Sequence, residues 1–149
     1  MRRLAAVCVV FSACLGVVPA AFALGKLEVY DAVAEIVATK PELLAGYATL
    51  KNTGDESVRI LTVQCDDFRA ASIQDVIGGG DAARMREMPW LRVDPGETVS
   101  LAPGGKRILL REPRNDFAPG DMIDLFFLLA DGRRVEAYFD VTAGPTGGD

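Results

Sequence analysis

Hydrophobic residues in the chain fall into short segments, and each segment ends at glycine, proline, asparagine or aspartate. Within the segments valine, isoleucine, leucine and threonine are frequent, and several segments alternate apolar with polar positions. Short runs of this kind, bounded by turn-forming residues, are typical of β-strands. The pattern predicts strands over residues 27–37, 45–50, 58–65, 71–77, 85–88, 98–101, 106–110, 122–130 and 133–141.

Two parts of this pattern allow more detailed predictions. In segment 58–65 the even positions are mostly β-branched, and the odd positions include Leu61 and Cys65. Because both sets contain apolar residues, the strand is predicted to be largely buried on both faces. Segments 122–130 and 133–141 are joined by Asp131-Gly132, a dipeptide that favours a type I′ hairpin turn.

The organisation of these segments indicates a single all-β domain. The chain contains no amphipathic helix of useful length, no internal repeat and no linker rich in glycine or serine. Regularly spaced short strands with glycine and proline turns are typical of an antiparallel β-sandwich. The length of 149 residues also fits one domain.

The N-terminal segment has the pattern of an export signal. Residues 1–3 are Met-Arg-Arg, residues 4–18 are an uncharged and mostly apolar run, and residues 21–23 are Ala-Phe-Ala. A basic start, a short apolar run and a small-x-small site are the three parts of a secretory signal peptide. We therefore expect cleavage after Ala23 and a periplasmic protein without a membrane span.

An alternative processing site lies within the same segment. Phe11-Ser12-Ala13-Cys14 loosely resembles a lipoprotein signal, although phenylalanine stands where leucine is usual. Cleavage after Ala23 is the preferred interpretation, and a lipoprotein anchored at Cys14 is the alternative. The expected organisation is a signal peptide over 1–23, one sandwich domain over 24–143 and a tail over 144–149.

Composition excludes several classes of site. The chain has 16 basic and 21 acidic residues, a net charge of −5 and no histidine, so serine–histidine catalysis and histidine-containing zinc sites are impossible. The acidic balance argues against nucleic acid as a partner. No nucleophile–base pair is recognisable, and we expect no enzymatic activity. After signal removal only Cys65 remains, which precludes an internal disulfide.

Three stretches, read in order, resemble a known family. They are Ala-Gly-Tyr-Ala-Thr-Leu-Lys-Asn-Thr-Gly-Asp at 45–55, Val-Asp-Pro-Gly-Glu-Thr-Val-Ser-Leu-Ala-Pro-Gly-Gly at 93–105, and Phe-Ala-Pro-Gly-Asp at 117–121 before the final hairpin. In order and spacing they resemble the periplasmic copper chaperones of the PCu(A)C type over roughly residues 27–141.

The resemblance implies a fold, a cargo and a partner. The fold it implies is a cupredoxin-like Greek-key β-sandwich, and the function is delivery of Cu(I) towards the dinuclear copper centre of cytochrome oxidase. The implied partner is a periplasmic copper protein or an oxidase-assembly protein, and we expect the chain itself to be monomeric.

The copper motif of that family is largely replaced in this sequence. Family members hold Cu(I) with the spaced set His-x10-Met-x21-His-x-Met. With Met85 as the first methionine, the other three ligand positions are occupied by Gln74, Arg107 and Leu109. An arginine repels a cation and has no lone pair to donate, an amide oxygen is a hard ligand, and leucine offers none. The resemblance therefore implies a degenerate Cu(I) site with Met85 as the only retained ligand position.

Other soft or charged residues lie near the motif in the sequence and are candidates to replace the missing ligands. Met88 is a candidate auxiliary ligand, but a strand would place it on the face opposite Met85. We expect Met88 and Met122 to fill gaps in the core and Cys65 to be buried and inert. Acidic residues near the motif are expected to form surface ion pairs with neighbouring arginines, in preference to a hard-metal site. These residues are Asp75, Asp81 and Glu87, with Arg84, Arg86 and Arg107.

Two functional hypotheses follow from this comparison. In the first, the protein is an exported copper-handling protein with a weakened or lost Cu(I) site at Met85. In the second, it is a periplasmic module that binds a protein or an anion through Arg107 and no longer binds copper.

Overall fold

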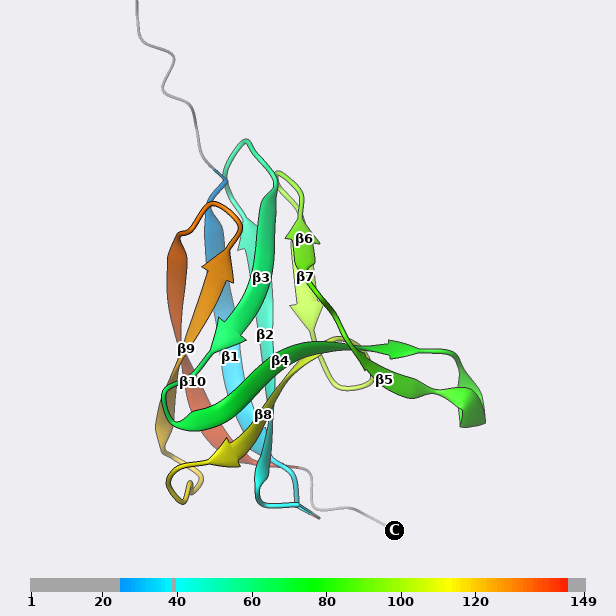
Figure 1. Ribbon diagram of the computed structural model, residues 1–149, viewed down its shortest axis with the longest axis vertical. Coiled ribbons are helices and arrows are strands. Elements are labelled where there is room, and N and C mark those ends of the chain that lie inside the picture. Colours follow the sequence, from blue (N-terminus) through cyan, green and yellow to red (C-terminus); the bar gives the residue numbers. More distant parts are fainter. Residues whose placement is uncertain (1–24, 39, 145–149) are drawn as a thin grey trace, which may run out of the picture.

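The computed structural model describes residues 25–38 and 40–144. The predicted signal peptide, with its two processing sites, and residues 145–149 of the predicted tail lie outside these described residues. Ten strands and one short 3₁₀ helix form the described chain, and Figure 1 shows most of them running side by side along the long axis. Their bounds are β1 (Leu27–Ile36), β2 (Leu43–Asn52), β3 (Val58–Gln64), β4 (Phe68–Ile77), η1 (Gly80–Ala82), β5 (Arg84–Glu87), β6 (Leu91–Val93), β7 (Thr98–Leu101), β8 (Arg107–Pro113), β9 (Met122–Leu129) and β10 (Arg134–Ala143).

All nine predicted segments are strands in the structure, and β6 is an additional one. Hydrogen bonds join the strands in the order β5-β4-β8-β2-β1-β10-β9-β3-β6, and β7 also pairs with β2. Neighbouring strands are antiparallel, as predicted, except for the parallel pair of β1 and β10. That pair brings the first and last strands together, so both ends of the domain are fixed within the sheet.

The hydrophobic core lies between the inner faces of these strands. On β2 and β8 the even-numbered residues face inward, including Leu44, Leu50, Ile108 and Leu110, all almost fully buried. β9 and β10 contribute Phe127 and Phe139, the largest fully buried side chains. Gly46 permits the close approach of β2 and β8, because a Cβ there would stand 3.0 Å from the Cβ of Ile108.

Strand β3 differs from its predicted burial. A bulge between Ile60 and Thr62 shifts the pairing of β3 with β9. Val58, Ile60 and Val63 are consequently all buried, whereas Leu61 is 43% exposed. The prediction of two buried faces is therefore wrong for Leu61. The extra residue of the bulge changes which positions face the core, an effect that a regular alternation does not show.

The hairpin between β9 and β10 is also built differently from the prediction. A type I′ turn requires a positive φ at both central residues, but only Gly132 has one, at 86°. The amide of Gly132 donates to the carbonyl of Leu129, and the amide of Leu129 donates to the carbonyl of Arg133. The loop thus has three residues, with Gly132 in the left-handed region closing the turn.

Asn52 holds one end of the sandwich together. Its side chain is fully buried at the end of β2. The carboxamide oxygen accepts hydrogen bonds from the amides of Lys26 and Gly54, and the nitrogen donates to the carbonyls of Glu56 and Val93. The polar groups of this side chain therefore bridge three separate chain segments, and a buried amide with all its bonds made specifies one local structure.

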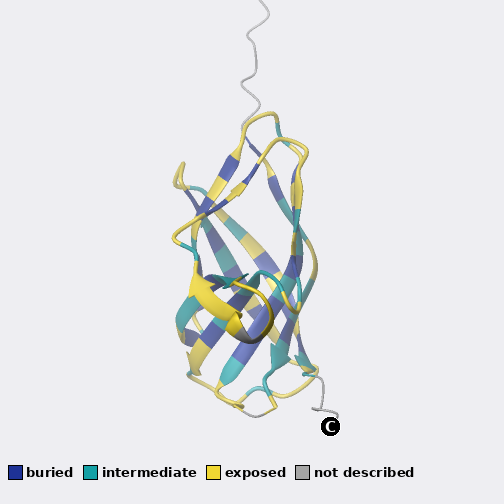
Figure 2. Cartoon of the chain, turned by 90° about the vertical axis from the view of Figure 1, so that its right-hand side faces the viewer, coloured by how far each residue is buried: buried dark blue, intermediate teal, exposed yellow. Residues whose placement is uncertain are grey.

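A two-stranded arm projects from the body of the sandwich. The second half of β4 and all of β5 extend sideways in Figure 1, with Gly78-Gly79-Gly80 and η1 at the tip. In Figure 2, which looks toward this arm, its end is exposed while buried positions alternate along the strands behind it. β4 and β5, together with β8 on the other side of β4, carry all four positions of the copper motif.

Candidate functional site

Strand register brings the copper-motif positions onto one face of three neighbouring strands. Gln74 of β4 lies directly opposite Arg107 of β8, and Met85 of β5 lies opposite Val76 of β4. Leu109 is two residues from Arg107 on β8 and therefore shares its face. Residues directly opposite each other in an antiparallel pair have Cβ atoms about 5 Å apart. The four positions accordingly form one continuous surface, although Met85 and Arg107 are two strands apart, about 10 Å.

The same face contains Ser72, which the sequence analysis did not connect with the motif, and Glu87, which it placed near the motif. Ser72 lies opposite Leu109, and Glu87 lies opposite Gln74. Ser72 is 6% exposed and is one of two buried polar residues in the described chain. The sequence could have indicated this placement, because Ser72 is two residues before Gln74 on a predicted strand and such residues point to the same face. We call this surface the Arg107 face, and it consists of Ser72, Gln74, Val76, Met85, Glu87, Arg107 and Leu109.

Two buried polar atoms on the Arg107 face have no hydrogen-bond partner among the described residues. They are the hydroxyl Oγ of Ser72 and the Nε of Arg107. The pairing of 72 with 109 and of 74 with 107 makes Ser72 and Arg107 diagonal neighbours on adjacent strands. A buried donor without a partner costs about 1–3 kcal/mol. Both groups therefore lack the hydrogen bond that a buried polar group normally makes, and a ligand that accepts hydrogen bonds would satisfy them.

The ion pairs expected around this face are not formed among the described side chains. The salt bridge found there joins Lys106 to Asp75, with Nζ 3.4 Å from Oδ2. Asp75 lies opposite Arg86, on the face turned away from Arg107. Arg107 makes no salt bridge with any described residue. The side chain of Asp81 is outside the described part of the structure. The prediction of an ion pair with Arg107 is thus wrong for the described residues. Asp75 is on the other face, and Glu87, on the same face, is separated from Arg107 by the strand that carries Gln74.

The additional soft residues lie away from the Arg107 face. Met88 is half-buried and packs against the core, as predicted, since its amide hydrogen-bonds to the carbonyl of the core residue Ile73. Cys65 is buried as predicted, and burial raises the pKa of its thiol. The prediction for Met122 is wrong. Its side chain is 61% exposed, because the odd-numbered residues of β9 fill the core and the even-numbered ones point outward.

The side chains on the Arg107 face do not fit Cu(I). Met85 is 37% exposed and can present a thioether, which is a soft ligand. Arg107 offers only N–H donors and a fixed positive charge, and Leu109 offers only hydrocarbon. In the described chain no three histidine, cysteine, aspartate or glutamate residues group as a metal site. The face is chemically better suited to an anion than to a cation.

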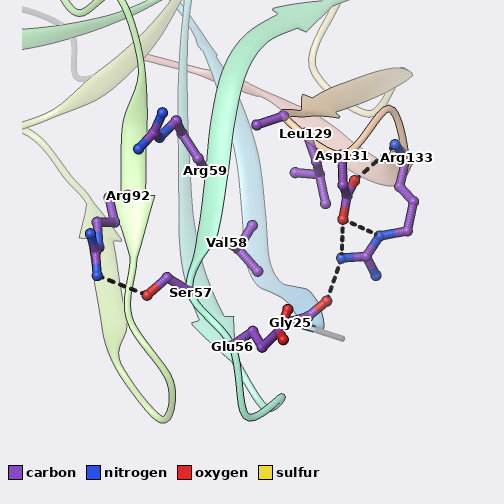
Figure 3. A pocket seen from close by; sticks show the side chains of 10 residues that line it. Gly25, Glu56, Ser57, Val58, Arg59, Arg92, Leu129, Asp131 and Arg133 are labelled. Atoms are coloured by element: carbon purple, nitrogen blue, oxygen red, sulfur yellow. Dashed lines mark hydrogen bonds and ion pairs between the residues drawn. The ribbon is translucent and has the colours of Figure 1, made fainter. Parts of the chain in front are cut away.

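A separate cavity of about 270 Å³ lies at the end of the sandwich where the described chain begins. Figure 3 shows that Arg133 bonds to Asp131 and to the carbonyl of Gly25, and that Arg92 bonds to Ser57. The guanidinium of Arg59 stacks over the ring of Trp90 at 5.1 Å. Each of the three arginines of this cavity thus already has a partner within the chain. The hydrogen bond from Arg133 to the carbonyl of Gly25 links the start of the described chain to the last hairpin.

Comparison with models of protein families identifies the family of this chain. The family described as "Putative lipoprotein LpqE-like" matches residues 27–141. A comparison with curated protein sequences found no significant match. No helix among residues 25–38 and 40–144 has the length and apolarity needed to cross a bilayer.

Solved structures with the same fold include several PCuAC domains. The apo PCuAC domain of PmoF2 is 20% identical, with a TM-score of 0.65 over 82% of this chain and 94% of that one. The copper-bound form of that domain is 19% identical, with a TM-score of 0.65 over 83% and 97%. CuI-DR1885 from Deinococcus radiodurans is 21% identical, with a TM-score of 0.67 over 84% and 83%. The fold predicted from the sequence, a cupredoxin-like Greek-key β-sandwich, is thereby confirmed.

Proposed function

From the premise that this chain belongs to the LpqE-like family, we propose that it is an exported, non-enzymatic binding protein whose site accepts an anionic group in place of Cu(I). The domain has the fold of copper-chaperone domains, but its ligand positions carry different chemistry. The observation that supports this most directly is the half-buried guanidinium of Arg107, which forms no ion pair with a described side chain, on the face that the copper motif would occupy.

Electrostatics favours this function over copper transport. A guanidinium remains protonated at every physiological pH, so Arg107 opposes any cation on this face. The same group beside a half-buried amide and a buried hydroxyl offers several donors to an anion. A change of ligand from copper to anion requires no change of fold, because function depends on the site and not on the fold that carries it.

Residual copper handling is the second candidate function. Met85 is exposed on the same face and could hold Cu(I) as a single thioether ligand. Two of the structural neighbours are described as copper-bound or CuI forms. One thioether is a weak anchor for a metal ion, so we propose that any Cu(I) affinity is far below that of a site with two imidazoles and two thioethers.

A competition titration decides between the two functions. The mature protein is titrated against a Cu(I) chelator of known affinity, with the Met85→Leu variant as a control. We expect the chelator to retain the copper in both cases. Tight binding by the natural protein that is lost in Met85→Leu would contradict the proposed function and support copper handling.

The location and the partner belong to the same proposal. We propose export by the N-terminal signal and a monomeric protein that meets its anionic ligand or partner outside the cytoplasm. The name of the matched family describes lipoproteins, which favours the Cys14 alternative more than the sequence alone does. Mass spectrometry of the exported protein separates the outcomes: an N-terminus at Leu24 supports signal cleavage after Ala23, and a lipidated Cys14 supports a membrane anchor.

A further inference from the structure

We infer that the anionic ligand is a monocarboxylate carried on an aliphatic chain, held by Arg107, Ser72 and Gln74. This inference rests on the proposed function and specifies the ligand class of the same site. The two buried polar atoms without partners, Arg107 Nε and Ser72 Oγ, are diagonal neighbours on adjacent strands. Ser72 is almost fully buried, and a buried hydroxyl without a hydrogen-bond partner gains more from a ligand that accepts its proton than an exposed hydroxyl does.

The donor geometry fits a planar carboxylate. A guanidinium presents two parallel N–H groups to the two oxygens of a carboxylate, and the resulting bonds are charge-assisted. Gln74 lies directly opposite Arg107 and can donate from its amide nitrogen, and the Ser72 hydroxyl adds one more donor. A carboxylate can accept about four hydrogen bonds, which matches the groups that this face supplies.

The charge of the face fits a single negative charge. Arg107 is the only cationic side chain among the residues that make up the face, and Glu87 lies opposite Gln74 on its other side. A phosphate monoester carries close to two negative charges at neutral pH, and Glu87 would repel the second. A monoanion therefore balances the single charge of Arg107 and meets less repulsion from Glu87 than a dianion does.

Apolar groups surround these donors. Leu109 and Val76 are half-buried, and Met85 is partly exposed, on the same face as the guanidinium. They lie on the three strands β8, β4 and β5, so they flank the polar groups on both sides. An alkyl chain attached to the carboxylate would cover this hydrocarbon surface and gain hydrophobic contact energy. A bare inorganic anion has no hydrocarbon and would gain no such contact energy.

Hexanoate is a suitable probe for the site. We expect titration of the isotope-labelled mature protein with hexanoate to shift the Nε–H resonance of Arg107 and the amide resonances of β4 and β8. Hexanamide has the same shape without the charge, and hexyl phosphate has a second charge. Both should bind at least about tenfold more weakly than hexanoate, because each loses the charge match at Arg107.

Variants assign the contacts to individual residues. Arg107→Leu should lower hexanoate affinity at least about tenfold, and Arg107→Lys should restore only part of it, since an ammonium lacks the planar fork. Ser72→Ala should lower affinity about threefold to tenfold, with no loss of folding. Arg86→Leu removes the same charge from the opposite face of the arm and should leave affinity unchanged.

A second arm of the experiment distinguishes the two sources of a carboxylate. A short peptide with an aliphatic C-terminal residue is tested with its terminus free and with its terminus amidated. If the free peptide binds at the Arg107 face more tightly than hexanoate, the natural ligand is a carboxylate of a protein partner. If hexanoate binds more tightly, it is a free carboxylic acid.

Three outcomes would overturn the inference. Hexanoate that shifts no resonance of the Arg107 face, equal binding by hexanamide, or unchanged binding by Arg107→Leu each contradicts a carboxylate site. Preferential binding of phosphate or hexyl phosphate at Arg107 would refute the monocarboxylate and leave the proposed anion-binding function intact. Tight Cu(I) binding at Met85 in the chelator competition would refute the proposed function itself.

Discussion

Gln74 and Arg107 lie directly opposite each other on β4 and β8, although 32 residues separate them in the chain. In the family resemblance these two positions belong to the two imidazole ligands. Their adjacency explains why the motif can have long gaps and still describe one site, since a ladder of β-strands sets the distance. In this protein the same adjacency joins an amide to a guanidinium, so hydrogen-bond donors stand at the positions that the resemblance assigns to two metal ligands.

Restoring the family ligands should create Cu(I) affinity. The triple variant Gln74→His, Arg107→His, Leu109→Met removes one repelling charge and adds two imidazoles and a thioether to the resident Met85. All four positions share one face of neighbouring strands. We expect measurable Cu(I) binding in chelator competition, weaker than in an intact relative because the surrounding hydrogen bonds are not optimised for the new ligands.

The natural protein and Arg107→His alone serve as controls for that variant. Both should bind Cu(I) much more weakly than the triple variant. If the triple variant folds, as judged by circular dichroism, and gains no affinity, the mapping of the motif onto positions 74, 85, 107 and 109 is wrong.

Replacing Arg107 by leucine should not destabilise the fold. The change removes a buried N–H group without a described partner and adds hydrocarbon beside Leu109, so the free energy of unfolding should rise by about 1 kcal/mol. Urea denaturation measures this, with Arg111→Leu as the control. Arg111 is exposed on the same strand, and its replacement should change stability by less than about 0.5 kcal/mol. A loss of stability in Arg107→Leu would assign Arg107 a structural role.

Replacing Asn52 by alanine should destabilise the domain by about 3 kcal/mol. The variant leaves two partly buried amides and two carbonyls, of which that of Val93 is buried, without their partners, and each unsatisfied group adds a desolvation cost. The control is Asn115→Ala, which removes one exposed hydrogen bond to Asp67 and should have little effect. Equal midpoints of urea denaturation for the two variants would contradict a central role for Asn52.

Glu28 should titrate well below the ordinary pKa of a glutamate side chain. Hydrogen bonds from Lys26 and Tyr30 hold the pKa of Glu28 at about 2, compared with an ordinary value of 4.5. Because the pKa is lowered in the folded state, the stabilisation by ionised Glu28 is complete above about pH 4.5 and is lost as the pH falls towards 2.

Nuclear magnetic resonance titration of the Glu28 carboxyl group checks this value. The variant Lys26→Met removes the strongest partner, whose Nζ lies 2.6 Å from Oε1, and should raise the midpoint of the titration. A midpoint near 4.5 in the natural protein would show that the exposed cluster does not persist in solution.

Local sequence patterns located nine of the ten described strands and missed only the three-residue β6, because side-chain alternation and turn residues act over a few positions. They did not reveal the bulge at Ile60, nor the three-residue turn closed by Gly132. Both features depend on how β9 pairs with its neighbours. The outward position of Met122 has the same origin, since the pairing partners of β9 decide which of its faces meets the core.

The sequence by itself determined nine of the ten described strand segments and the absence of histidine. It also predicted that Cys65 is the single cysteine left after signal removal and, through the family resemblance, that three copper-ligand positions are replaced. Only the tertiary structure decided that Ser72 lies beside Arg107, that Asp75 and Lys106 pair on the other face, and that Asn52 is buried with four hydrogen bonds. The physical reason is that alternation along one strand fixes relative faces within that strand, whereas the register between strands fixes which residues meet across the sheet.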